Sequence, residues 1–203
     1  QTEMPFNPLS KFNPIPDSLT PVIRNIMVID YVPFRNTFYP VAKKILPVND
    51  PEAASVEKHD TISYSSLAGI AVETDDRMNG SNALLGVRKI MLKVNGKVEF
   101  HFEADRFSFS ETRFVNACID YATLIEQGKN FVLLHHLPGN DFSAISTQKN
   151  QGFLDGGFNL PVQCEVVVSD FNGNAVSKSF YIRKEKQHAF PSLPEENRYI
   201  AFN

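Results

Sequence analysis

The segment Leu67–Phe109 decides the fold. It opens with Leu67-Ala-Gly-Ile-Ala-Val-Glu-Thr-Asp75 and, after a polar loop, continues as Gly86-Val-Arg-Lys-Ile-Met-Leu-Lys-Val-Asn-Gly-Lys-Val-Glu-Phe-His-Phe-Glu103. Apolar residues alternate at Ala68, Ile70 and Val72, and the even positions from 90 to 94 and from 98 to 102 are apolar as well. This period of two is typical of strands with one buried face. The segment therefore predicts three strands, the last two joined at Asn95-Gly96.

Side-chain parity predicts the register of that hairpin. Cross-strand partners share a face, so the numbers of two paired residues must sum to an even number. A two-residue turn would pair Leu92 with Glu99 and place a carboxylate in the core. A three-residue loop that ends at Gly96 pairs Leu92 with Val98, and Ile90 with Phe100, and it requires a left-handed Gly96.

The same parity recurs near the end of the chain. A Phe171-Asn172-Gly173 loop pairs Val168 with Val176, and again requires a left-handed glycine. Three earlier segments also read as strands: Val22–Tyr31, Phe38–Val48 and, more weakly, Thr61–Tyr64. Two such hairpins and several short strands predict a mainly β chain, an antiparallel immunoglobulin-like β-sandwich.

Between the two hairpins the spacing of apolar residues changes from two to three or four. Ser108 and Glu111 have the spacing of a capping box. Apolar residues then recur at three and four positions until Gly128, the stripe of an amphipathic helix. Its members are Phe114, Ala117, Cys118, Tyr121 and Leu124 or Ile125. We therefore expect one helix inside a long insertion at about residues 106–157, followed by a strand at residues 131–137.

These patterns divide the chain into three parts. Residues 1–21 contain five prolines and should form an extended lead-in. Residues 22–183 should form the sandwich, with a polar loop at residues 49–60. Residues 184–203 read as a charged tail that could pack back through Phe190, Tyr199, Ile200 and Phe202.

Composition narrows the class of protein. Hydrophobic residues make up 42 % and charged residues 21 % of the 203 positions, which is ordinary for a globular chain. The net charge of -3 argues against a nucleic-acid partner. No apolar run reaches the ~18 residues of a membrane span, and we expect neither such a span nor a signal peptide in the sequence given. Cys118 and Cys164 read as two buried thiols, with a disulfide as the alternative.

The histidines and cysteines do not form a known metal motif. The sequence lacks His-x-His, His-Glu-x-x-His and paired Cys-x-x-Cys, and it has neither a Gly-x-Ser-x-Gly elbow nor a phosphate loop. His135 and His136 are adjacent in a predicted strand, so their rings should point to opposite faces, one packed and one exposed. We expect no metal, no cofactor and no catalytic residue.

Two sets of polar residues are candidates for binding. The first lies in the loop after the first quoted strand, and the second lies where strand passes to helix. The sets are Asp76, Arg77 and Asn79, and Asp105, Arg106, Glu111 and Arg113. We expect both sets mainly to tie loops to the sandwich, with Arg77 and Arg106 each partly buried against a carboxylate or backbone carbonyls.

Two other interpretations of these residues stay open. The acidic loop Glu73, Asp75, Asp76 and Asn79 offers oxygen ligands for calcium, although it lacks the twelve-residue EF-hand pattern. Asp105 and Glu111 could form the acid pair of a hydrolase, which would need a cleft and one carboxyl with a raised pKa.

Three blocks of the sequence resemble a known family. They are Gly69–Asn82 with Gly86-Val87, then Asp105–Arg113 with Ile119-Asp120-Tyr121 and Leu137–Asn140, and finally Val166–Asn174. Together they resemble the region that follows the catalytic domain in secreted zinc endopeptidases of the lysostaphin/LytM type from Bacteroides-like bacteria. The resemblance covers most of residues 7–183, and its middle block is the most specific.

What the resemblance implies is an accessory role. The family binds zinc through a His-x-x-x-Asp and a His-x-His on its catalytic domain, and this sequence has neither, since His136 to Asn140 ends in Asn. We therefore expect a non-catalytic periplasmic or cell-envelope domain that positions or regulates a peptidoglycan metallopeptidase. Its partner would be a peptidase domain of the same polypeptide or cell-wall material. The alternative is a stand-alone envelope module that binds glycan or protein.

Overall fold

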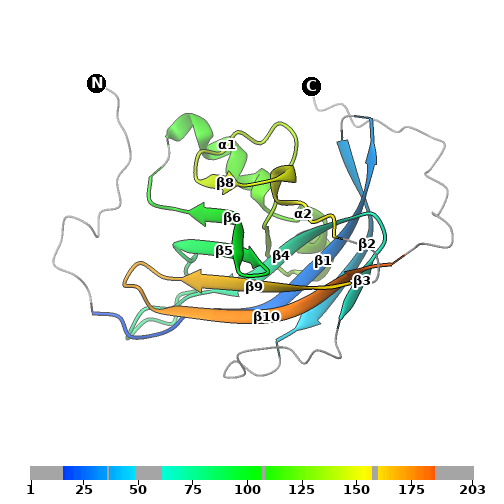
Figure 1. The fold of residues 1–203 in the computed structure, drawn as a ribbon. Helices are drawn as coiled ribbons and strands as arrows, with labels where there is room; N and C mark the ends of the chain where they lie inside the picture. Colours follow the sequence, from blue (N-terminus) through cyan, green and yellow to red (C-terminus); the bar gives the residue numbers. More distant parts are fainter. Residues whose placement is uncertain (1–15, 36, 49–60, 107, 157–159, 186–203) are drawn as a thin grey trace.

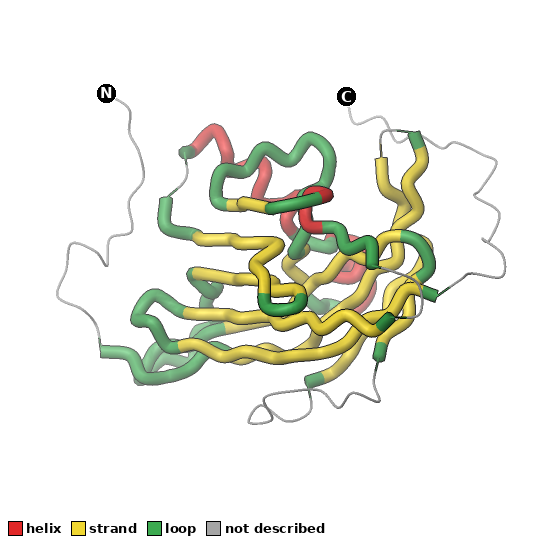
Figure 2. Tube along the Cα trace, viewed as in Figure 1, coloured by secondary structure: helices red, strands yellow, loops and turns green. Residues whose placement is uncertain are grey.

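The computed structural model describes residues 16–35, 37–48, 61–106, 108–156 and 160–185, and these residues form a mainly β fold of two layered sheets (Figure 1). The strands are β1 (Val22–Phe34), β2 (Thr37–Pro47), β3 (Ile62–Tyr64), β4 (Leu67–Asp75), β5 (Lys89–Val94), β6 (Lys97–Glu103), β7 (Phe131–Leu133), β8 (Ile145–Thr147), β9 (Pro161–Ser169) and β10 (Ala175–Lys184). The helical segments are η3 (Phe109–Glu111), α1 (Thr112–Val115), η4 (Asn116–Cys118), α2 (Tyr121–Gln127) and η5 (Asn150–Gly152). Figure 2 shows how far the strands outweigh the short helices.

The strands pair in two sheets. One sheet has the order β2-β1-β4-β7, and the other has the order β3-β10-β9-β5-β6-β8. The pairs are antiparallel except β3 with β10, which is parallel. The mainly β fold class is therefore confirmed.

The core lies between the two sheets. Ile26 and Ile70 of one sheet, and Leu92, Val166 and Phe180 of the other, belong to a single buried cluster. Alternation along the strands produces this cluster, because every second side chain faces the opposite sheet. Burial of these apolar side chains is the main source of stability for such a fold.

A second cluster covers the other face of the four-stranded sheet. Met27, Ile29 and Tyr31 of β1 pack there with Phe131 and Phe153. As a result Ile26–Tyr31 is buried on both faces, which explains why this part of β1 is apolar at nearly every position.

The first hairpin has a different register from the predicted one. Asn95 and Gly96 form a two-residue turn in which both residues have positive φ, 48° and 80°. Leu92 pairs with Phe100, and Lys93 pairs with Val98, so Glu99 between them is an extra, unpaired residue. The pairs beyond the bulge keep the predicted even sum, but the extra residue is Glu99 in β6 and not a third loop residue. The predicted pairings of Leu92 with Val98 and of Ile90 with Phe100 were therefore wrong.

The second hairpin agrees with its prediction. Val168 pairs with Val176, Asp170 N–H donates to the Asn174 carbonyl at 3.1 Å, and Gly173 has a φ of 93°. The three strands predicted before Leu67 are also confirmed as β1, β2 and β3 within one or two residues at each end, except that β1 continues to Phe34.

The predicted single helix is interrupted. Both of its ends are confirmed, because Ser108 and Glu111 form a capping box and Gly128 ends α2 with a φ of 68°. Between them Ile119 is extended, at φ -119° and ψ 141°, and bridges to Val132 of β7. Tertiary strand pairing therefore overrides the local helical period.

The break changes the face that α2 buries. Tyr121 and Ile125 of the predicted stripe are 64 % and 68 % exposed, whereas Leu124, the alternative to Ile125, is half-buried. Thr123 is the buried residue of α2 instead. The predicted stripe was therefore wrong at Tyr121 and Ile125.

The segment at residues 106–157 contributes to both sheets. Its strand β7 extends the four-stranded sheet beside β4, and β8 extends the six-stranded sheet beside β6. The predicted strand at residues 131–137 is confirmed only as far as Leu133.

Several predictions fall outside the described residues. They concern most of the lead-in at residues 1–21, the loop at residues 49–60 and nearly all of the tail at residues 184–203. Within the described residues Cys118 and Cys164 are both buried free thiols, and burial raises the pKa of the Cys164 thiol to about 12. None of the described helices has the length and apolarity needed to cross a membrane.

Candidate functional site

The first predicted polar set lies at one end of the sandwich. Asp76 is buried and its Oδ1 accepts the Arg77 N–H at 2.8 Å. Asn79 donates its N–H to Asp17 Oδ1 at 3.2 Å and its side-chain amide to Ser18 Oγ at 3.2 Å. These bonds attach the loop after β4 to the segment that leads into β1.

Three carboxylates that are far apart in sequence meet at this end. Oxygens of Asp17, Asp76 and Asp170 all lie within 4.8 Å of one another. Burial raises the pKa of the Asp76 carboxyl, the Arg77 N–H lowers it, and the charges of Asp170 and Asp17 raise it further. Together the three side chains could offer oxygen ligands to a hard cation such as Ca²⁺.

Hydrogen bonds within turns explain the placement of these carboxylates without an ion. Asp170 accepts both the N–H of Asn174, at 2.8 Å, and its side-chain amide, at 2.7 Å. Asp17 accepts the Leu19 N–H at 3.1 Å as well as that of Asn79. We therefore do not assign a metal site to this cluster.

The calcium ligands considered from the sequence do not converge. Glu73 accepts a hydrogen bond from Asn25, and Asp75 forms an ion pair with Arg24, so both are used along the β1–β4 pair. Only Asp76 of that loop belongs to the carboxylate cluster. No local motif relates Asp17 and Asp170 to Asp76, because the three come together only when the strands pair.

The second predicted set is organised around Glu111. Its Oε2 accepts the Ser108 N–H and hydroxyl, both at 2.8 Å, and its Oε1 accepts the Ser143 N–H at 3.0 Å. Hydrogen bonds from Ser143 and Ser108 lower the pKa of Glu111 to about 2. Glu111 thus joins the start of the helical stretch to the loop before β8.

The remaining members of this set lie on the surface. Asp105 is exposed, 3.6 Å from a guanidinium nitrogen of Arg88. Arg113 is exposed, with its guanidinium 4.7 Å from the Phe114 ring centroid. Asp105 and Glu111 therefore use different partners, and the lowered pKa of Glu111 is the opposite of what a general acid requires.

The prediction that Arg77 and Arg106 are partly buried was wrong. Both side chains are exposed. The physical reason is that Asp76 and Glu111 are satisfied by backbone N–H and hydroxyl donors, which reach them without the entropy cost of fixing a long arginine side chain.

The adjacent histidines have different surroundings. His135 is buried: its Nδ1–H donates to the Ile70 carbonyl at 3.2 Å, and its Nε2 accepts the Tyr31 hydroxyl at 3.1 Å. Burial lowers the pKa of His135 to about 4. His136 is half-buried, so the expectation of one packed ring is confirmed while its neighbour is less exposed than predicted.

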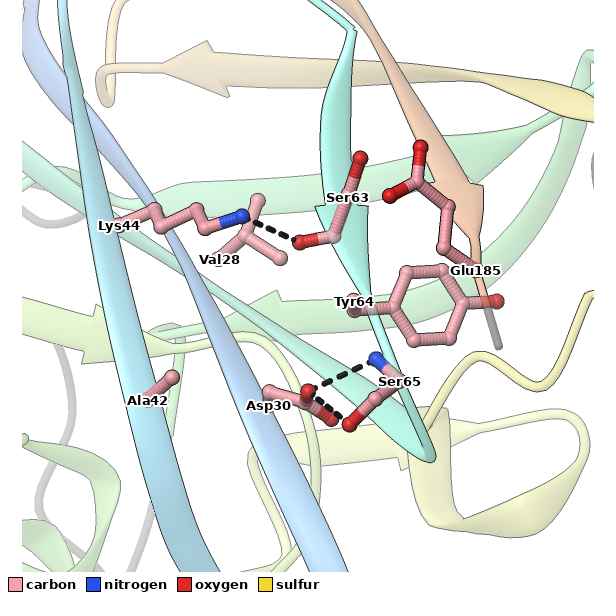
Figure 3. Close-up of a pocket in the computed structure, with 8 residues that line it drawn as sticks. All are labelled: Val28, Asp30, Ala42, Lys44, Ser63, Tyr64, Ser65 and Glu185. Atoms are coloured by element: carbon pink, nitrogen blue, oxygen red, sulfur yellow. Dashed lines mark hydrogen bonds between the residues drawn. The ribbon is translucent and has the colours of Figure 1, made fainter. Parts of the chain in front are cut away.

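A hollow of about 260 Å³ opens between the edge strands β2 and β3 (Figure 3). Lys44 donates to the Ser63 carbonyl at 2.9 Å across it, and Asp30 accepts the Ser65 N–H at 2.7 Å. Hydrogen bonds from Ser63 and Arg183 lower the pKa of Glu185 on its wall. The charged groups of this hollow are thus already engaged in holding the edge of the sandwich together.

A larger hollow of about 440 Å³ lies at the ends of β5, β9 and β10, where the loop at residues 149–156 borders it. Its lining combines apolar side chains with Asn95, Glu99, Lys149 and Asn150. Sequence reasoning missed this hollow because its residues come from five separate segments. The local signal in the sequence is the parity of the first hairpin, which requires one extra residue, and that residue is Glu99.

Comparisons of the chain with protein-family models, with curated proteins and with solved structures find no match.

Proposed function

We propose that the chain is a non-catalytic accessory domain that positions or regulates a cell-wall metallopeptidase. One observation carries this proposal: each of the three quoted blocks contains a carboxylate that accepts hydrogen bonds from backbone N–H groups. Asp76 accepts Arg77 N–H, Glu111 accepts Ser108 and Ser143 N–H, and Asp170 accepts Asn174 N–H. Two accessory domains of the same kind would share such residues, because these residues form the turns and helix caps of the fold.

The order of the strands supports an immunoglobulin-like module. In that fold one sheet contains strands A, B and E, and the other contains G, F, C and C′. Here β1, β4 and β7 are neighbours in that order, and β10, β9, β5 and β6 follow the second order. The added β2 at one edge and the parallel β3 beside β10 are departures from the simplest version.

The proposed location is the periplasm or cell envelope, and the proposed partner is a peptidase domain of the same polypeptide or cell-wall material. The reading frame upstream of Gln1 should then encode a domain that carries the His-x-His motif. Cleavage of purified peptidoglycan by that domain should change in rate or in site preference when the present chain is added to it or fused to it.

The chain alone should neither retain zinc nor cleave peptidoglycan peptides. Elemental analysis of the purified chain and mass spectrometry of peptidoglycan digests measure both. Stoichiometric zinc bound through His135 or His136, or cleavage by the chain alone, would overturn the accessory role. So would an upstream reading frame without a peptidase.

The alternative is a stand-alone envelope-binding module, and the hollow of about 440 Å³ favours it. A glycan ligand would need an exposed ring on which to stack. The two rings that line this hollow, Tyr64 and Phe153, are each only 3 % exposed. Co-sedimentation of the chain with purified cell-wall sacculi, with no peptidase present, distinguishes this alternative.

A further inference from the structure

The hollow at the ends of β5, β9 and β10 has an apolar floor. Val94, Val162 and Ile182 come from the three strands, and Leu154 comes from the loop that borders them. Leu160 stands at the rim with 67 % of its surface exposed. A volume of about 440 Å³ falls within the range of ~300–1,000 Å³ found for ligand pockets.

A break in the β5–β6 ladder lies on one side of the hollow. Glu99 is the extra residue of the bulge in β6, and it lines the hollow although its neighbours Val98 and Phe100 are paired with β5. Bulges re-aim a side chain at the cost of ladder pairing. Here the bulge turns Glu99 away from the core position that a regular two-residue hairpin would give it.

A left-handed turn follows on the same wall, where the N–H of Gln148, one residue before Lys149, donates to the Glu99 carbonyl at 3.0 Å. Asn150, Gln151 and Gly152 have φ values of 47°, 55° and 82°. Left-handed residues other than glycine are costly and persist only where surrounding contacts hold them. Among the bonds that hold this turn, the His136 N–H donates to the Gln151 carbonyl at 2.7 Å. The turn presents Lys149 and Asn150 on the lining of the hollow.

Among the described residues, Glu99 and Lys149 of this hollow have no charged partner, unlike the charged groups of the smaller hollow. No hydrogen bond or ion pair joins the Glu99 carboxylate or the Lys149 ammonium to another side chain of the described residues, nor does one join them to each other. By contrast, Asp155 on the same wall forms an ion pair with Lys184. The Asn95 side-chain oxygen accepts the Gln163 N–H at 3.3 Å, which leaves its NH₂ group as a donor.

We propose that this hollow binds a short peptide that carries a cationic and an anionic residue on either side of an apolar one. The apolar side chain covers the floor beside Leu160, the cation faces Glu99, and the anion faces Lys149. The amides of Asn95 and Asn150 bond the peptide backbone. A glycan fits less well, because the two rings of the described lining, Tyr64 and Phe153, are both buried. The site stands on its own geometry and would remain if the chain served no peptidase.

Titrations of the ¹⁵N-labelled chain with three blocked tripeptides test this site. The probes are acetyl-Lys-Leu-Glu-amide, its reverse acetyl-Glu-Leu-Lys-amide, and the uncharged acetyl-Gln-Leu-Gln-amide. We expect amide shifts at Asn95, Glu99 and Lys149, with one charged order preferred. Loss of each partly exposed charge contact should weaken binding by about two- to fivefold, so the uncharged probe should bind most weakly.

A charge exchange makes the test specific. Glu99→Lys combined with Lys149→Glu keeps the net charge and should reverse the preferred order of the two charged probes. The matched control is Lys93→Glu combined with Glu165→Lys, which exchanges an existing ion pair across β5 and β9 and should leave the preference unchanged. Should the double exchange not fold, Lys149→Glu alone should abolish the preference.

Three results would overturn the proposal. The first is the absence of shifts at these amides with every probe, and the second is binding of the uncharged peptide as tight as that of the charged ones. The third is a trimer of N-acetylglucosamine that shifts the same amides while the peptides do not, which would assign the hollow to a glycan.

Discussion

The hydroxyl of Tyr31 donates to Nε2 of His135 at 3.1 Å, directly over Gly69. The pair joins β1 to the end of β7 across β4, and Phe153 packs against both rings. Because Nδ1–H donates to the Ile70 carbonyl, the imidazole is held as one neutral tautomer. Burial raises the pKa of Tyr31 and lowers that of His135, so both groups are kept uncharged.

Acidification should destabilise the chain through His135. Its pKa is about 4 in the fold and 6.5 as the ordinary value, so between these values the unfolded chain binds more protons. The stabilisation that neutral His135 contributes is complete above pH 6.5 and is lost as the pH falls toward 4. The free energy of unfolding should fall by ~3 kcal/mol over this window. Urea unfolding between pH 7 and pH 4 measures it.

His135→Gln is the control for this prediction, because glutamine does not titrate. The free energy of unfolding of that variant should change less with pH across the same window. An imidazole that titrates near pH 6.5 in the folded chain, followed by NMR, would contradict the burial effect.

Gly69→Ala should destabilise the fold, although glycine itself weakens the interior of a strand. A Cβ at Gly69 would lie 2.6 Å from Cε1 of His135 and 2.6 Å from Cε2 of Tyr31. Overpacking of this kind costs about 1–3 kcal/mol. In a His135→Ala background the added cost should shrink, since one of the two rings is gone, and a double-mutant cycle of unfolding free energies measures the coupling. Equal costs in both backgrounds would show that the rings do not require the glycine.

Gly96→Ala should lower the free energy of unfolding by on the order of 1 kcal/mol, for a different reason. Nothing lies within 4 Å of a Cβ at Gly96, so the cost comes only from a φ of 80°. Gly86→Ala is the matched control, because its Cβ also meets nothing within 4 Å and its φ is outside the left-handed region. Thermal unfolding should separate the two variants, and equal melting temperatures would count against the left-handed turn.

Glu111→Gln should lower the melting temperature, whereas Arg106→Ala should not. Glu111 accepts three hydrogen bonds that join two loops, while Arg106 is exposed. Because the pKa of Glu111 is lowered to about 2, its stabilisation is present above pH 4.5 and lost as the pH falls toward 2. Exposed substitutions such as Arg106→Ala or Lys97→Ala usually stay within about 0.5 kcal/mol of zero. A clear loss of stability in Arg106→Ala would restore the structural role first predicted for it.

Asp76→Asn should raise the melting temperature at pH 7 in the presence of a chelator. The raised pKa of Asp76 means that its charged form is disfavoured in the fold, and asparagine keeps an oxygen for the Arg77 N–H. Asp75→Asn, which removes the partner of Arg24, should bring no such gain. Should Ca²⁺ raise the melting temperature of the unmodified chain but not of Asp76→Asn, the carboxylate cluster would prove to bind the cation.

Local chemistry decides the features that the sequence alone predicts. Alternation places Ile26, Ile70 and Leu92 in one core, because a strand turns every second side chain to the same face. The Ser108–Glu111 capping box and the left-handed Gly128 and Gly173 involve residues no more than a few positions apart. Their backbone preferences hold whatever the rest of the chain does.

Contacts between distant segments decide the rest. The even-sum rule requires one extra residue in the first hairpin, but only the packed sheet selects a bulge at Glu99. Likewise Ile119 leaves the helix because Val132 offers it a strand partner. Pairing across a sheet compensates for the loss of a regular ladder or of a helical turn. The spacing of residues within one segment does not predict such pairing.

The candidate sites depend most strongly on these distant contacts. Tyr31 and His135 are 104 positions apart, and the larger hollow unites Glu99 of the first hairpin with Lys149 and Ile182. The sequence by itself determined the strands, their inward faces and several turns, because these follow from interactions over a few residues. Only the tertiary structure decided which polar groups meet, because that depends on the order in which the strands pair.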